Sequence, residues 1–171
     1  EDNEKRAFEL SQVNEISKKK PNILPYKHLV TLSQSKNNLT DIMEALKRTG
    51  EVKDIDEDKL EERVKCIKQW TQNYAPESVV FEIQEEAPEI DLDDLQTKCI
   101  KLLIEKMKDV DWTPEGIHNS FYELQEENQI PAKNFFKIIY NILLDKERGP
   151  RLGFFLATMD KKFIIERLES Y

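Results

Sequence analysis

Residues 112–145 read WTPEGIHNSFYELQEENQIPAKNFFKIIYNILLD, and this stretch decides the fold class. Thr113 is a residue type that caps helices and Pro114 suits the first helical position, so a helix is predicted from here to about Asn128. Pro131 then opens a second helix that runs to the end of the stretch, with apolar residues three and four positions apart. Two amphipathic helices in succession predict an all-α protein, because such helices must pack their apolar faces together.

The same helical periodicity continues on both sides of this stretch. The piece Val79–Ile83 could be extended, but no strand partner for it is evident. Two of the other predicted helices cover 1–10 and 25–35. A third is capped by Asn38 or Thr40 and ends at Gly50, a fourth starts at Asp56, and a fifth starts at Asp91 or Asp93. Two short helices, at 152–159 and 161–169, close the chain.

The charge distribution divides the chain. The 171 residues carry 26 Lys and Arg against 34 Asp and Glu, a net charge of −8, which at face value argues against nucleic acid as a partner. Residues 69–97, however, contain eight acids and no Lys or Arg, so the whole net charge lies there. From residue 129 to the end, eight bases face five acids, a local charge of +3. The charge pattern is therefore more informative than the net charge.

This pattern predicts the domain organisation. We expect a linker at 1–25, a first helical lobe at 26–75, an acidic connector at 76–90 and a second helical lobe at 91–171. The chain begins at Glu1 rather than Met, so we expect it to be a piece of a longer polypeptide.

Cysteine and histidine usage argues against metal and redox chemistry. Cys66 and Cys99 are too far apart for a metal or redox motif, and His28 and His118 are isolated from them. We expect two unpaired, buried thiols in a reducing compartment, hence a cytoplasmic protein, and no apolar run approaches a membrane span. No nucleophile elbow or phosphate-binding glycine loop occurs, so no catalytic residues and no metal site are predicted.

The window Arg148–Gly153 holds two of the four glycines and two arginines. It is either a helix–helix turn, in which glycine supplies an unusual φ, or a stiff turn whose guanidinium groups meet phosphate or base edges. Both interpretations can hold at once.

One face of the preceding helix supports the second interpretation. Lys133, Lys137, Tyr140 and Asn141 share this face and lead into the turn, which would suit single-stranded nucleic acid. An ordinary solvated helix face is the alternative.

Several strings resemble class I lysyl-tRNA synthetases. The closing segment of that family is similar to DKERGPRLGFFLA (145–157) and MDKKFIIERL (159–168), and the start of its carboxy-terminal domain is similar to PYKHLV (25–30) with Gln34. RAFELS (6–11) resembles the tail of its connecting region. The resemblance covers essentially the whole chain in matching order.

The resemblance implies an anticodon-binding domain, an α-helical cage of two lobes similar to that of glutamyl-tRNA synthetases. The family's catalytic half uses ATP and carries HIGH and KMSKS signatures, which are absent here, so this piece is expected to be non-catalytic and to hold no cofactor. The implied partners are the anticodon loop of tRNA-Lys and the catalytic domain of the same chain, with no membrane.

By position, the resemblance points to Tyr140 and the turn as the anticodon contacts. We expect Lys133, Lys137 and Arg148 near phosphates, and Tyr140 and Arg151 stacking on bases or reaching base edges. The predicted nucleic-acid-binding residues are Lys133, Lys137, Tyr140, Asn141, Arg148, Gly149, Pro150, Arg151 and Leu152.

Two other classes of function remain open from the residues. One is a non-catalytic helical protein-interaction module that uses the acidic connector, and the other is a small helical hydrolase or transferase. The second is disfavoured because no catalytic constellation can be assembled.

Overall fold

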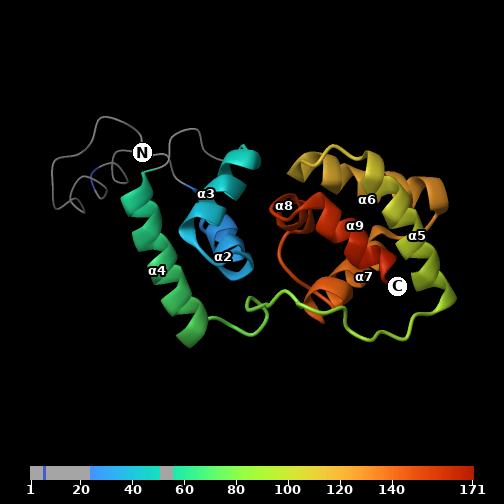
Figure 1. Cartoon of the computed structure of the whole chain (residues 1–171), viewed down its shortest axis with the longest axis horizontal. Helices are drawn as coiled ribbons and strands as arrows, with labels where there is room; N and C mark the ends of the chain where they lie inside the picture. Colours follow the sequence, from blue (N-terminus) through green and yellow to red (C-terminus); the bar gives the residue numbers. More distant parts are fainter. Residues whose placement is uncertain (1–5, 7–23, 51–55) are drawn as a thin grey trace.

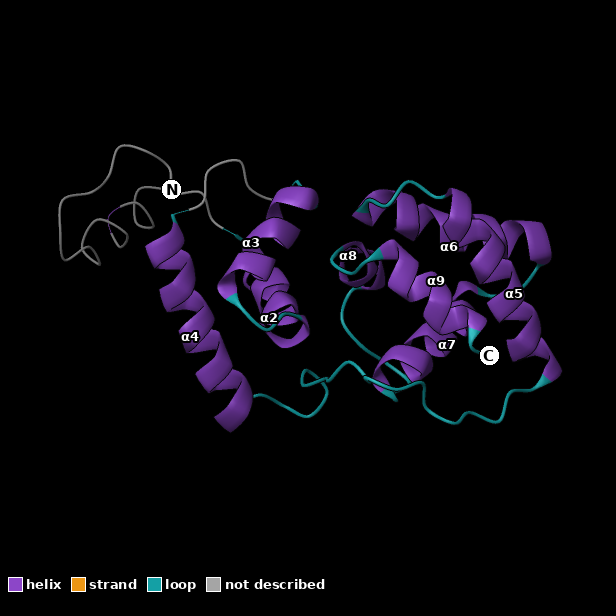
Figure 2. Cartoon of the chain, viewed as in Figure 1, coloured by secondary structure: helices purple, strands orange, loops and turns teal. Residues whose placement is uncertain are grey.

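The computed structural model describes residues 6, 24–50 and 56–171, and within them every regular element is a helix. The helices between residues 26 and 73 form one group, the amino-terminal group, and those between residues 94 and 169 form another, the carboxy-terminal group. A long loop runs between the two groups (Figures 1 and 2). The all-α prediction is confirmed, whereas the helix predicted at 1–10 lies outside the described residues except for Arg6. The helices are α2 (Tyr26–Ser35), α3 (Leu39–Arg48), α4 (Glu57–Asn73), α5 (Asp94–Asp109), α6 (Pro114–Asn128), α7 (Ala132–Leu144), α8 (Leu152–Ala157) and α9 (Lys161–Glu169).

The helices begin where local capping signals place them. Asn38 accepts a hydrogen bond from the backbone of α3, and Thr113 accepts one from the first turn of α6, with Pro114 as its first residue. Asp93, one of the two predicted choices, caps α5 through a reciprocal pair of hydrogen bonds with Gln96. These starts need only residues within one turn of each other, which is why the sequence predicts them well.

The glycines of the Arg148–Gly153 window serve a different purpose from the one expected. Neither has a positive φ; among the described glycines only Gly50 does, at 71°. A Cβ on Gly149 would lie 2.7 Å from the Tyr140 ring, and one on Gly153 would lie 2.5 Å from the Pro114 carbonyl oxygen. The unusual backbone angle was the wrong explanation, and close approach to neighbouring atoms is the right one.

Two separate hydrophobic clusters stabilise the fold. The larger lies in the carboxy-terminal group and includes fully buried Phe121, Phe135 and Phe155. The smaller, which we call the amino-terminal cluster, comprises Leu24, Leu29, Val30, Leu32, Ile42, Ala45, Leu46, Leu60, Val64, Ile67 and Phe154. Phe154 is its only member from α8, so one aromatic ring of the carboxy-terminal group packs in the core of the other.

The acidic connector is fastened to the carboxy-terminal group. The Arg167 guanidinium donates hydrogen bonds to the carbonyl oxygens of Gln84, Glu85 and Glu86 at 2.7–3.1 Å. The Tyr171 hydroxyl donates another to the carbonyl oxygen of Pro88. Phe81 of the connector also belongs to the larger cluster. The domain boundaries at 25, 75 and 90 stay a prediction.

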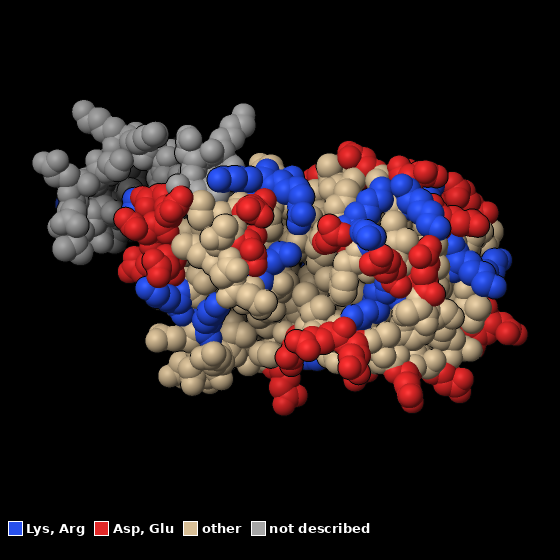
Figure 3. All heavy atoms as spheres, in the orientation of Figure 1, with Lys and Arg blue, Asp and Glu red and all other residues tan. Residues whose placement is uncertain are grey.

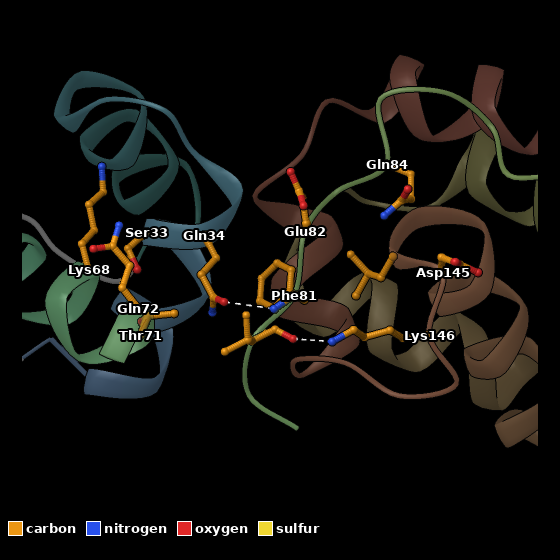
Figure 4. A pocket seen from close by; sticks show the side chains of 12 residues that line it. Ser33, Gln34, Lys68, Thr71, Gln72, Phe81, Glu82, Gln84, Asp145 and Lys146 are labelled. Atoms are coloured by element: carbon orange, nitrogen blue, oxygen red, sulfur yellow. Dashed lines mark hydrogen bonds between the residues drawn. The ribbon is translucent and has the colours of Figure 1, made fainter. Parts of the chain in front are cut away.

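The segment Val79–Phe81 lies between the two helix groups. It does not form a strand in the described chain. The Gln34 side chain donates to the Val79 carbonyl at 3.3 Å and accepts from the Phe81 amide at 3.0 Å. From the other side, the Lys146 ammonium donates to the Val80 carbonyl at 2.6 Å (Figure 4). Side chains thus replace the strand partner that the sequence did not reveal.

The two thiols differ in their environment. Cys99 is buried as expected, and burial raises the pKa of its thiol, whereas Cys66 is exposed, so the expectation of two buried thiols is wrong for Cys66. No helix in the described ranges combines the length and the apolar character that a bilayer crossing requires.

Candidate nucleic-acid interface

The turn between α7 and α8 is braced by Tyr140. The Tyr140 hydroxyl donates a 2.5 Å hydrogen bond to the carbonyl oxygen of Pro150, and its ring lies directly against Gly149. Burial of this phenol raises its pKa from 10.0 to about 12, so the hydroxyl remains a donor to a more alkaline pH than an exposed tyrosine does. Tyr140 is therefore placed to hold the turn, which is a different role from the base stacking expected of it.

Replacing Tyr140 by phenylalanine should lower the free energy of unfolding by about 1 kcal/mol, because the Pro150 carbonyl loses its donor. Chemical denaturation at pH 7 measures this. The native pKa lies above the ordinary value of 10.0, so the stabilisation is present below pH 10 and is lost as the pH rises toward 12. The difference in stability between wild type and Tyr140→Phe should therefore shrink over that interval, and a constant difference would contradict this role.

The helix face that the sequence singled out is only partly available. The Lys137 ammonium forms a 2.6 Å ion pair with Glu147, which holds the pKa of that carboxyl below its usual range. Lys133 is exposed and Asn141 is half-buried on the same helix. Leu152 is 6% exposed and packs in the larger cluster, so its side chain is not accessible to a ligand.

The turn forms one wall of a groove between the two helix groups. This groove has a volume of about 630 Å³, and four of the predicted residues line it: Arg148, Gly149, Pro150 and Arg151. The opposite wall comes from α2 and α4, and residues 78–81 of the connector close a third side. Lys133, Lys137, Tyr140, Asn141 and Leu152 are not among the residues that line it.

The α2–α4 wall is the part of the site that the residue-by-residue reasoning missed. It presents Tyr26, which is 47% exposed, together with Lys27 and the half-buried Trp70. Tyr26 and Lys27 belong to the PYKHLV string, which is one of the strings that carry the resemblance. The structure thus brings that string and the Gly-Pro-Arg turn to the two sides of one groove, although more than 100 residues separate them in sequence.

The floor of the groove joins the two walls. The His28 ring from α2 stacks on the Phe154 ring from α8 at a centroid distance of 4.0 Å and an interplanar angle of 14°. Phe154 itself enters the amino-terminal cluster three residues after Arg151. The arginine-bearing turn is consequently fixed to the opposite helix group by a buried ring.

Charge distinguishes this groove from a second hollow on the other side of Val80 and Phe81. The described residues that line the first groove include three cations, Lys27, Arg148 and Arg151, and no carboxylate. The second hollow, of about 770 Å³, mixes Lys68 and Lys146 with Glu82 and Asp145 (Figure 4). A polyanion is therefore favoured in the first groove and not in the second.

Eight of the carboxylates lie in residues 69–97. Acidic side chains follow the lower edge of the molecule in Figure 3, where the connector runs in Figure 1. An acidic protein thus carries a groove whose own lining is positive, which removes the objection that the net charge of −8 raised against nucleic acid.

Comparison with known proteins now identifies the family. A family model described as an anticodon binding domain matches residues 60–171. The chain is 32% identical over 170 residues to a lysine–tRNA ligase of Picrophilus torridus, with 99% of this chain and 33% of the relative covered. Similar ligases occur in Thermoplasma acidophilum (32% over 152 residues, 89% and 30% covered) and Borrelia garinii subsp. bavariensis (36% over 171 residues, 97% and 31% covered).

The matches agree with the resemblance noted from the strings. Nearly the whole chain aligns with lysine–tRNA ligases, and it spans about a third of the length of the curated relatives it matches. The matched family region includes α5 to α9 and the Arg148–Arg151 turn. The chain belongs to the anticodon binding domain family.

Proposed function

We propose that the groove between α2, α4 and the Arg148–Arg151 turn binds the anticodon loop of tRNA-Lys. The observation that carries this proposal is the groove itself: three cations, the aromatic side chains of Tyr26 and Trp70 on one wall, and no carboxylate among the described lining residues. Unpaired RNA bases need planar surfaces and polar groups that contact their edges, while the sugar–phosphate backbone needs cations. The groove supplies each of these, and family membership favours the anticodon as the RNA segment.

The two arginines have different settings in the turn. Arg151 is the residue immediately before α8, whose Leu152 and Phe154 are both buried, so its backbone is fixed. Arg148 lies at the other end of the turn, next to Glu147 of the exposed ion pair. We assign base-edge contact to Arg151, because recognition of a base edge needs a well-positioned guanidinium, and phosphate contact to Arg148.

Aminoacylation is assigned to the rest of a longer enzyme. The relatives are lysine–tRNA ligases about three times as long as this chain, and neither HIGH nor KMSKS occurs in its 171 residues. In this proposal the chain recognises the cytoplasmic tRNA and needs no cofactor of its own. A catalytic domain of the same polypeptide activates lysine with ATP.

Replacing Arg151 by alanine should weaken binding of the tRNA-Lys anticodon stem-loop by about 1–3 kcal/mol, the scale of one specific base contact. Binding to a stem-loop with a changed anticodon should weaken less, so discrimination should fall. Fluorescence anisotropy titrations with both RNAs measure the two affinities at one fixed salt concentration.

The matched control is Lys65→Ala, which removes an exposed cation of α4 that is ion-paired with Glu61 and does not line the groove. This variant should bind both RNAs as the wild type does. An equal loss for both RNAs in Arg151→Ala would place Arg151 on a phosphate, and unchanged binding would overturn the proposed groove.

A further inference from the structure

We infer that Tyr26 and Trp70 form a stacking wall for an unpaired RNA base, opposite the arginine-bearing turn. The inference rests on the proposed function and gives the two walls of the groove different roles. The wall with Tyr26 and Trp70 contacts base faces without regard to sequence, and the wall with the arginine-bearing turn contacts base edges. The observation behind it is an aromatic pair on the α2–α4 side of the same groove.

The two rings come from different helices and meet at the groove. Tyr26 is the first residue of α2, which Pro25 precedes, and Trp70 lies near the end of α4. Their ring centroids are 6.4 Å apart and their planes are inclined at 71°, an edge-to-face pair. This contact orients the Tyr26 ring, while 47% of the residue stays exposed.

The two rings differ in how far they are packed against the hydrophobic core. Trp70 packs partly against the amino-terminal cluster, so its indole has a structural role as well. Tyr26 is absent from that cluster and remains about half-exposed at the groove. A large exposed ring beside a cavity lined by cations is a surface to which the flat face of a base can add.

The opposite wall offers complementary groups. Arg148 and Arg151 are exposed, and the turn between them is held by the Tyr140 hydroxyl. A base that stacks on Tyr26 would present its edge to this turn, because both line the same groove of about 630 Å³. Stacking tolerates any base since every base has a π face, whereas hydrogen bonds to an edge do not.

The chain offers a matched control for Tyr26. Tyr74 follows Trp70 by four residues, is 79% exposed, and does not line the groove. It has the same side chain as Tyr26 and is more exposed. It lies just beyond the end of α4, the helix that contains Trp70. Its removal tests whether any exposed tyrosine in this region affects RNA binding.

The experiment titrates the chain with the tRNA-Lys anticodon stem-loop and with an anticodon-changed stem-loop. Tyr26→Ala should weaken binding of both RNAs by about tenfold, the effect typical of losing one base stack. Tyr26→Phe should bind as the wild type does, because the ring remains, and Tyr26→Leu should resemble alanine. Tyr74→Ala should bind both RNAs normally.

A second readout follows Trp70 directly. The chain has two tryptophans, and Trp112 lies elsewhere, where its indole donates to the Met159 carbonyl. In a Trp112→Phe background, the fluorescence of Trp70 should be quenched when RNA is added, because a base then lies beside the Tyr26–Trp70 pair. Tyr26→Ala should reduce that quenching at saturating RNA.

The outcomes separate this inference from the proposed function. If Arg151→Ala loses discrimination while Tyr26→Ala binds normally, the stacking wall is wrong and the proposed function stands. If Tyr26→Ala weakens binding of only one of the two RNAs, Tyr26 contacts a base edge, and the assignment of different roles to the two walls is wrong. If the wild type binds neither RNA, the proposed function fails and this inference fails with it.

Discussion

Replacing Phe154 by alanine should lower the free energy of unfolding by about 3–5 kcal/mol, the usual cost of removing a buried phenylalanine ring. The residue is 3% exposed, and its ring packs among side chains of α2, α3 and α4 although its backbone belongs to α8. Its loss therefore leaves a cavity at the junction of the two helix groups. Urea denaturation followed by circular dichroism measures the change.

The same variant should also weaken RNA binding by the groove. The Phe154 ring stacks on His28, so it holds the Arg148–Arg151 turn against the α2 wall. Without the ring, the two walls lose their shared floor and their separation is less well fixed. The loss of affinity should appear at temperatures at which the variant is still folded.

Phe121→Ala provides the matched control. Phe121 is fully buried in the larger cluster, on α6, and does not line the groove. The control should lose a similar free energy of unfolding and should bind RNA normally when folded. Equal RNA affinities for Phe154→Ala and Phe121→Ala would show that the ring stabilises the core without shaping the groove.

The helices could be predicted from the sequence because their signals are local. Thr113, Pro114 and Asp93 each act within one helical turn, so neither the fold class nor these helix starts depended on knowing what packs where. Periodicity identified the apolar face of each helix in the same way. It gives no information about which other helix will cover that face.

Neighbouring phenylalanines in α8 illustrate this limit. Phe154 packs in the amino-terminal cluster, whereas Phe155 packs in the larger one. Both look alike in the sequence, since both are apolar residues of one short helix. The groove floor, which depends on Phe154 crossing between the groups, could not be predicted from the pattern.

The candidate site shows the same division. The Arg148–Arg151 turn was predicted from its glycines and arginines, and it does line the groove, while its contact with RNA stays a prediction. Tyr140 was expected on an open helix face, but Gly149 of the turn packs against its ring and the Pro150 carbonyl accepts a hydrogen bond from its hydroxyl. Tyr26 was passed over as a site residue because it is separated from the turn by more than 100 residues.

Replacing Arg167 by alanine should lower the free energy of unfolding by about 3 kcal/mol, because three carbonyl oxygens of the connector lose a charged donor. The side chain is well shielded, since Arg167 is 7% exposed and its guanidinium lies 5.1 Å from the centre of the Phe163 ring. Denaturation with urea measures the loss.

The connector should also become open to proteolysis in this variant. Glu85 and Glu86 each accept a hydrogen bond from Arg167 through their carbonyl oxygens, so their backbone is held in place in the wild type. A glutamate-specific protease should cleave there faster in Arg167→Ala, and mass spectrometry of the fragments locates the cut. Arg167→Lys should be intermediate, because an ammonium group lacks the planar fork that reaches three carbonyls at once.

Lys162→Ala is the matched control, since it removes an exposed cation of the same helix whose partner is Glu166 within α9. This variant should keep both its stability and the slow cleavage of the wild type. Cleavage at Glu85 and Glu86 that is equally slow in Arg167→Ala would mean that the other contacts, such as the hydroxyl of Tyr171 on the Pro88 carbonyl, suffice to hold the connector. Faster cleavage would instead show that a single guanidinium fixes the acidic segment whose far end, residues 78–81, closes the groove.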